Sequence, residues 1–159
     1  MSLRAESPAR TPGTAGTAGL ARVRRGSLAA LVLVVTEYVI GMYVNLYSTV
    51  PVADHGHGLG AAIGNGPVLL SIHAVIGLLL GLGALGVLWQ AIRSRRAAVI
   101  ASSAVGLFAL AMADVAGAGF TSTGDRSASM AMSVLTGFAL LCYAANVYLV
   151  RPKGTGADG

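Results

Sequence analysis

The chain has 159 residues, of which 55% are hydrophobic and only 11% are charged. A water-soluble domain carries about a quarter charged residues, so this composition excludes an ordinary soluble globule and indicates contact with lipid. The formal net charge of +5 does not indicate nucleic-acid binding, because ten of the eleven Lys and Arg residues lie in three segments that flank apolar runs. Ten of these residues are Arg, and Ala and Gly are abundant, which fits a GC-rich bacterial genome.

Residues 1–27 are rich in Ser, Pro, Gly, Thr and Ala, and this composition predicts a disordered basic N-terminal arm. Four apolar segments follow, and each exceeds the roughly 20 residues that a helix needs to cross a bilayer. Their bounds are 28–50, 67–92, 97–120 and 127–150, and residues 151–159 are predicted to be a disordered tail. Because an isolated strand would leave backbone groups unpaired in lipid, the predicted fold class is all-α, a transmembrane four-helix bundle.

The first apolar segment has a secretion signal as its alternative interpretation, since Arg24 and Arg25 precede it. It is too long for an ordinary signal core and contains Glu37 and Asn45, so we predict a retained helix. Basic residues gather in the N-terminal arm, in the tight loop 93–96 and after the last segment. The positive-inside rule then predicts a multi-pass protein of the bacterial cytoplasmic membrane with both termini in the cytoplasm.

Each predicted helix carries a polar residue at a similar distance from its outer end. These residues are Asn45, His73, Asp114 and Ser133, and the helical rise places all four about 7–10 Å below the outer boundary. Polar groups at such depth usually face the interior of a bundle. We therefore predict a polar cluster near the outer face, in which Asp114 holds the tautomer of His73 by a hydrogen bond. A polar network that only fixes helix register is the alternative.

Glu37 lies deeper than this layer, and no basic residue is expected at its depth. Two roles stay open for it, a proton-binding site or a protonated acid that hydrogen-bonds to a neighbouring helix. Gly41 lies one turn from both Glu37 and Asn45, and Gly77 lies one turn from His73. We interpret these glycines as positions that permit close helix packing.

Metal ligation has one weak candidate. Asp54, His55 and His57 lie in the glycine-rich segment 51–66, and two imidazoles with a carboxylate can hold Zn²⁺ or Cu²⁺ weakly. The segment supplies no further ligand at a defined spacing, so a solvated loop is the favoured interpretation. The single cysteine, Cys142, excludes an intrachain disulfide and is interpreted as a packing residue.

Three function classes remain open. The first is a non-enzymatic accessory or binding protein that contacts lipid, with a membrane-protein partner or a second copy of the chain as possible partners. The second is a haem-binding membrane cytochrome, in which His73 would be an axial ligand with Met130 or Met132 opposite it. The third is an oligomeric transporter or a proton-relay component. No enzyme is predicted, because no nucleophile elbow, metalloprotease helix, phosphate loop or catalytic carboxylate pair is present in the sequence.

Two stretches, GMYVNLYSTVP (41–51) and HAVIGLLLGLGAL (73–85), resemble a group of small four-span bacterial membrane proteins of no established activity. The resemblance covers residues 28–150. It implies the same four-helix architecture and draws attention to Asn45 and His73, but it implies no catalytic role.

Overall fold

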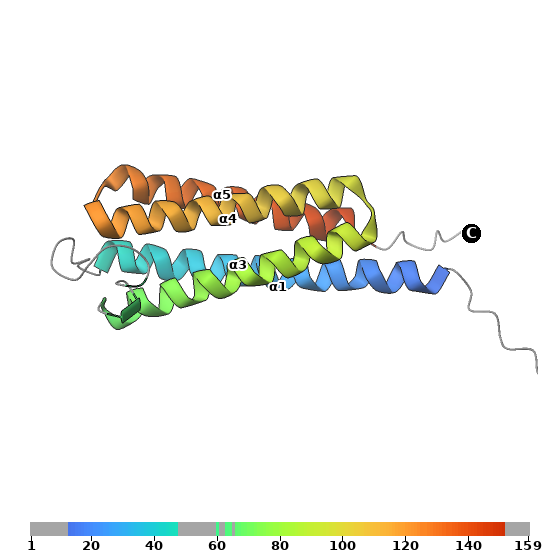
Figure 1. Ribbon diagram of the computed structural model, residues 1–159, viewed down its shortest axis with the longest axis horizontal. Coiled ribbons are helices and arrows are strands. Elements are labelled where there is room, and N and C mark those ends of the chain that lie inside the picture. Colours follow the sequence, from blue (N-terminus) through green and yellow to red (C-terminus); the bar gives the residue numbers. More distant parts are fainter. Residues whose placement is uncertain (1–12, 48–59, 61–62, 65, 152–159) are drawn as a thin grey trace, which may run out of the picture.

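The computed structural model describes residues 13–47, 60, 63–64 and 66–151. It contains four long helices, α1 (Gly13–Tyr47), α3 (Val68–Ser94), α4 (Ala97–Thr123) and α5 (Arg126–Leu149) (Figure 1). The described residues contain no strand, and all four helices are long and apolar enough to cross a membrane. The chain is therefore an all-α, four-helix protein of the multi-pass membrane type, as its composition predicted.

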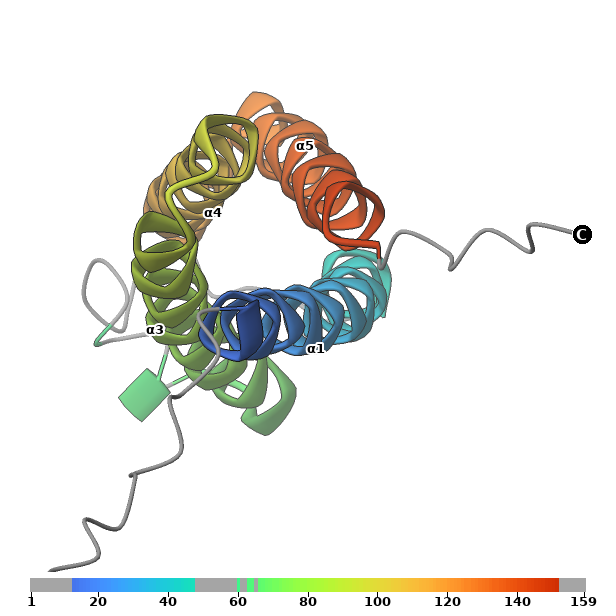
Figure 2. The same ribbon diagram turned by 90° about the vertical axis from the view of Figure 1, so that its right-hand side faces the viewer.

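The four helices form a closed ring. Each packs against two others, α1 against α3 and α5, and α4 against α3 and α5. Seen along the bundle axis, the four helices are arranged around a common centre (Figure 2). Successive helices run in opposite directions (Figure 1). This arrangement lets side chains from all four helices meet on the axis, which is where polar groups in a membrane bundle avoid lipid.

Helix α1 begins at Gly13, whereas the composition predicted a disordered arm up to residue 27. Within this early part, Val23 and Ser27 are fully buried. Val23 packs with Ala91, Val99 and Val150, which come from the ends of the other helices. The N-terminal part is therefore helical because distant parts of the chain cover it, and Ala, Leu and Arg are good helix formers. Residues 1–12 and 152–159 of the predicted arm and tail lie outside the described residues.

The helix ends have identifiable causes. Arg95 caps the end of helix α3; its φ of 55° is left-handed, and its N–H donates to the carbonyl of Ile92. Gly124 (φ 70°) caps the end of helix α4, and its N–H donates to the carbonyl of Phe120; glycine adopts this conformation without steric cost. Asp125 caps the start of helix α5 and accepts hydrogen bonds from the Ser127 N–H (2.9 Å) and hydroxyl (2.6 Å). These bonds lower the pKa of the exposed Asp125 carboxyl.

Apolar side chains fill the middle of the bundle and also cover its outside. The central cluster includes Val34, Leu80, Leu110 and Tyr143, one from each helix. Large apolar side chains are exposed all around the bundle, as a lipid-facing surface requires. They include Val39, Leu82, Phe108, Val115, Phe138 and Leu141.

Two hydrogen bonds join α4 to α5 inside the bundle. The Asn146 side-chain N–H donates to the Ser103 hydroxyl oxygen at 2.9 Å, and both residues are fully buried. The Ser102 hydroxyl donates to the backbone carbonyl of Cys142, also at 2.9 Å. The two helices approach closely at Gly106, where a methyl group would lie 3.1 Å from Cβ of Cys142. Cys142 is a partly buried free thiol in this interface.

The described basic residues gather mainly at one end of the bundle. Arg22, Arg24 and Arg25 lie in the first part of α1, Arg93, Arg95 and Arg96 lie at the α3–α4 turn, and Arg151 follows α5. Figure 1 shows these three segments together at the right-hand end. The candidate site described below lies toward the opposite end.

Candidate functional site: a polar cavity in one half of the bundle

A cavity of about 90 Å³ lies inside the ring, in the half remote from the basic residues. Its wall follows α4 from Leu110 to Thr121, a rise of about 16 Å along the helix axis. All four helices contribute to the wall. The residues with direct chemical interest are Glu37 and Gly41 from α1, His73 and Gly77 from α3, Asp114 from α4 and Thr136 from α5.

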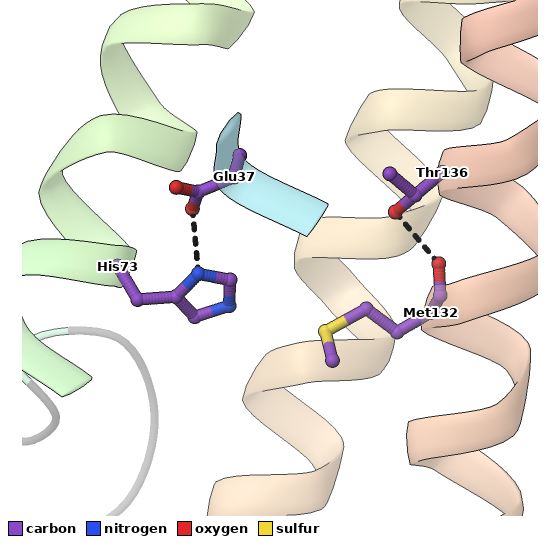
Figure 3. A network of polar contacts seen from close by, with 4 residues as sticks. All are labelled: Glu37, His73, Met132 and Thr136. Carbon is purple, nitrogen blue, oxygen red and sulfur yellow. Dashed lines mark hydrogen bonds and ion pairs between the residues drawn. The ribbon is translucent and has the colours of Figure 1, made fainter. Parts of the chain in front are cut away.

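An ion pair between α1 and α3 forms one side of this cavity. Nδ1 of His73 lies 2.7 Å from Oε1 of Glu37, and their side chains are 19% and 9% exposed (Figure 3). The contact is an ion pair by distance, since Nδ1 makes no hydrogen bond of good geometry. The other carboxyl oxygen of Glu37, Oε2, is buried without a hydrogen-bond partner. A buried oxygen of this kind is costly unless a partner reaches it.

This pair corrects two expectations drawn from the sequence. Glu37 has a basic neighbour at its depth, His73, and Glu37 rather than Asp114 is the carboxylate at Nδ1 of His73. The physical reason is the level at which the helices meet. His73 packs at the level of Gly41, one turn deeper than Asn45. Counting residues from predicted helix ends ignored this offset of about 6 Å.

The absence of a side chain at Gly41 makes room for the imidazole of His73. A methyl group at Gly41 would lie 2.8 Å from Cε1 and 3.3 Å from Nε2 of His73. The missing side chain therefore lets the ring lie against the backbone of α1, within reach of Glu37 one turn away. The sequence analysis assigned Gly41 to helix packing only. Its position between Glu37 and Asn45 was the available signal for a role in the site.

Asp114 approaches the same region from α4. A methyl group at Gly77 would lie 3.4 Å from both Oδ1 of Asp114 and Oε1 of Glu37. The two carboxyl groups thus border the same space beside α3, and Gly77 leaves that space open. Asp114 is exposed while Glu37 is buried, so Asp114 is the more accessible of the two carboxyls along the cavity wall.

Asn45 and Ser133 lie at the edge of the site. Asn45 lines the main cavity and also a smaller one of about 40 Å³, where Ser133 is found. The side-chain oxygen of Asn45 accepts a hydrogen bond from the hydroxyl of Ser129 at 3.2 Å, which joins α1 to α5. The Ser133 hydroxyl donates to the carbonyl of Ser129 in its own helix. The predicted residues therefore gather around two adjoining cavities, and the Ser133 hydroxyl bonds within α5 rather than to His73 or Asp114.

The far wall of the cavity, on α5, is formed by Met132 and Thr136. The Thr136 hydroxyl donates to the carbonyl of Met132 at 2.8 Å (Figure 3). Sequence reasoning did not identify Thr136, because a threonine that hydrogen-bonds within its own helix is common in membrane spans. Its oxygen can still accept a hydrogen bond from a ligand.

The site does not fit haem. Nδ1 of His73 is paired with Glu37, so only Nε2 is left to ligate an iron. The cavity of about 90 Å³ is far below the roughly 300–1,000 Å³ of pockets that hold drug-sized molecules. Of the two methionines considered as a second ligand, Met132 lines the cavity and Met130 is 71% exposed.

Within the described part of the chain, no group of three or more His, Cys, Asp or Glu side chains is arranged to hold a metal ion. The weak metal candidates Asp54, His55 and His57 lie outside the described residues. No protein-family model, curated protein or solved structure matches the chain.

Proposed function

We propose that this chain is a non-enzymatic integral membrane protein that binds a small polar ligand in the cavity between its helices. The observation that carries the proposal is the Glu37–His73 ion pair in the cavity wall, with Oε2 of Glu37 buried and unpartnered. Burying such groups in a membrane helix costs free energy, and intramembrane ionisable residues commonly mark ligand or ion sites. The cavity beside Glu37 and His73 has a volume of about 90 Å³, which is enough for a ligand of a few heavy atoms.

Binding is favoured over conduction because the cavity does not continue through the bundle. Its inner end is formed by Leu80 and Leu110, which belong to the central apolar cluster together with Val34. A proton relay or an ion path needs polar groups or water along its length. The apolar layer separates the cavity from the buried Ser103–Asn146 pair in the other half.

Catalysis has no support from the hydroxyl groups near His73. Ser133 and Thr136 both donate to backbone carbonyls of α5. A hydroxyl nucleophile must lie within hydrogen-bond reach of its base, and neither residue is paired with His73 in this way.

We place the protein in a bacterial cytoplasmic membrane, with the basic end of the bundle in the cytoplasm. The cavity then lies in the outer half of the membrane, and its ligand arrives from outside. Clustering of the basic segments at one end supports this orientation.

A ligand screen tests the proposal. The detergent-purified chain is heated with small polar compounds at millimolar concentration, and the unfolding temperature is recorded for each. A ligand of the site raises this temperature, and the increase is lost in Glu37→Gln and Asp114→Asn. Asp125→Asn is the matched control, since this carboxyl lies outside the cavity at the start of α5. If no compound in the screen stabilises the protein, or if Asp125→Asn removes the effect equally, the proposal is wrong.

A further inference from the structure

We infer that the ligand is a small ammonium-type cation, and that its binding releases the proton that His73 carries in its ion pair with Glu37. The inference rests on the proposed function, because it names the ligand class of the same cavity. Three observations carry it: the charge of the groups that face the cavity, the unpartnered oxygen of Glu37, and the space beside Gly77.

The charge of the cavity wall selects a cation. The titratable groups that face the two adjoining cavities are Glu37 and Tyr38 from α1, His73 from α3 and Asp114 from α4. Helix α5 contributes only uncharged side chains there, such as Met132 and Thr136. Two carboxyl groups face one imidazole, so an anion would meet net repulsion, whereas a cation meets attraction that a low-dielectric setting strengthens.

The acceptors around the cavity suit a ligand that donates hydrogen bonds. Oε2 of Glu37 is buried and lacks a donor. Oδ1 of Asp114 and Oε1 of Glu37 both border the space beside Gly77. An ammonium group carries three N–H donors, as the lysine side chain does, and a charged donor forms the stronger kind of hydrogen bond with a carboxylate.

Size limits this ligand to a few heavy atoms. A cavity needs a volume of about 10–15 Å³ to hold one water molecule, so a cavity of about 90 Å³ has room for several. Methylammonium fits such a space. A quaternary ion has no N–H to donate to Glu37.

The contact between Glu37 and His73 explains why binding of a cation should release a proton. At 2.7 Å the contact is an ion pair when the imidazole carries a proton, which gives it a positive charge. An arriving cation supplies positive charge to the same carboxylate, so the proton leaves to water on the cavity side. One cation enters and one proton departs, and the net charge of the site does not change. Binding coupled to proton release makes affinity depend on pH.

Calorimetry on the detergent-purified full chain tests both parts. Methylammonium chloride is titrated in buffers of different ionisation enthalpy, which gives the number of protons released per ligand bound. We expect about one proton, and an affinity that rises about tenfold per pH unit while the pair still holds its proton. Tetramethylammonium, which has no N–H, should bind much more weakly.

The variants separate the roles of the residues. Glu37→Gln should lose methylammonium binding. His73→Asn should still bind it, but without proton release and without the dependence on pH. Gly77→Ala places a methyl group 3.4 Å from both carboxyl oxygens and should weaken binding, whereas Gly81→Ala, with nothing within 4 Å of the added carbon, should not. Both alanine variants gain the same helix propensity, so they form a matched pair.

Each contrary result has a distinct meaning. If methylammonium does not bind but another small polar compound stabilises the chain through Glu37, the ligand class is wrong and the proposed function stands. If methylammonium binds the unaltered chain without releasing a proton, the exchange is wrong. If nothing binds at the cavity, both proposals are wrong.

Discussion

The imidazole of His73 on α3 lies directly against the backbone of Gly41 on α1, where a methyl group would come within 2.8 Å of its Cε1 atom. This contact fixes the ring in the position from which Nδ1 reaches Oε1 of Glu37. A single glycine therefore determines the geometry of the ion pair. Its replacement is a direct test of whether the pair depends on this packing.

Gly41→Ala should displace the His73 ring and lengthen its contact with Glu37. Crowding of this kind costs about 1–3 kcal/mol, which the better helix propensity of alanine offsets by up to about 1 kcal/mol. We expect a net loss of stability in denaturant unfolding and a changed ring chemical shift for His73. Gly19→Ala in the same helix is the control, because nothing lies within 4 Å of its added carbon. Equal effects of both substitutions would contradict the proposed role of Gly41.

The buried hydrogen bond between Asn146 and Ser103 should contribute to the association of α4 and α5. Asn146→Leu removes the donor and leaves the Ser103 hydroxyl without this partner. Ser103→Ala removes the acceptor, and the two single changes should not add in the double variant. A double-mutant cycle of unfolding free energies should give a coupling of about 0.6 kcal/mol, and at most about 1.7 kcal/mol, as such cycles give for bonds between membrane helices. A coupling of zero would mean that the two side chains do not stabilise each other.

The start of α5 should weaken in acid. Hydrogen bonds from Ser127 lower the pKa of Asp125 from its ordinary value of 3.8, so the ionised form is favoured in the folded protein. Its contribution to stability is present above the unfolded pKa and is lost as pH falls through the lower folded pKa. Asp125→Ala should therefore destabilise the chain at neutral pH and make little difference well below pH 3.8. Unfolding temperatures of the two proteins against pH check this, and a difference that persists undiminished in strong acid would oppose it.

The orientation of the bundle is testable at the two ends of α4. Ala97 and Thr123 begin and end this helix, and both are exposed. In a Cys142→Ala background, Thr123→Cys should react with a membrane-impermeant maleimide applied to intact cells, or to spheroplasts if an outer membrane is present. Ala97→Cys should react only after the membrane is opened. The reverse pattern would place the basic end outside and overturn the positive-inside assignment.

The spans were predictable because membrane insertion depends on local composition. The predicted starts at residues 67, 97 and 127 lie beside the observed Val68, Ala97 and Arg126. Runs of apolar residues between charged ends carry this information within each segment. The early start of α1 was not predictable in this way, since Val23 is covered by Ala91, Val99 and Val150, which lie far along the chain.

The sequence predicted which residues line the site better than it predicted which of them contact each other. His73, Asp114 and Asn45 were identified from their depth, and all three line the main cavity. Depth along a helix says nothing about rotation around its axis or about how far one helix is offset from the next. For that reason Glu37 was placed without a basic neighbour, although it contacts His73.

The length of α1 has a consequence for the mechanics of the bundle. Its 35 residues extend for about 52 Å, while the hydrocarbon layer is about 30 Å thick. The apolar contacts of Val23 with Ala91 and Val150 therefore lie at the basic end, where water is close.

Water drives apolar surfaces together, whereas lipid does so only weakly. The helices are consequently held together at the basic end by burial of apolar surface from water. The first turns of α1 therefore stabilise the bundle through contact with water, a contribution that the part of the bundle surrounded by lipid cannot supply.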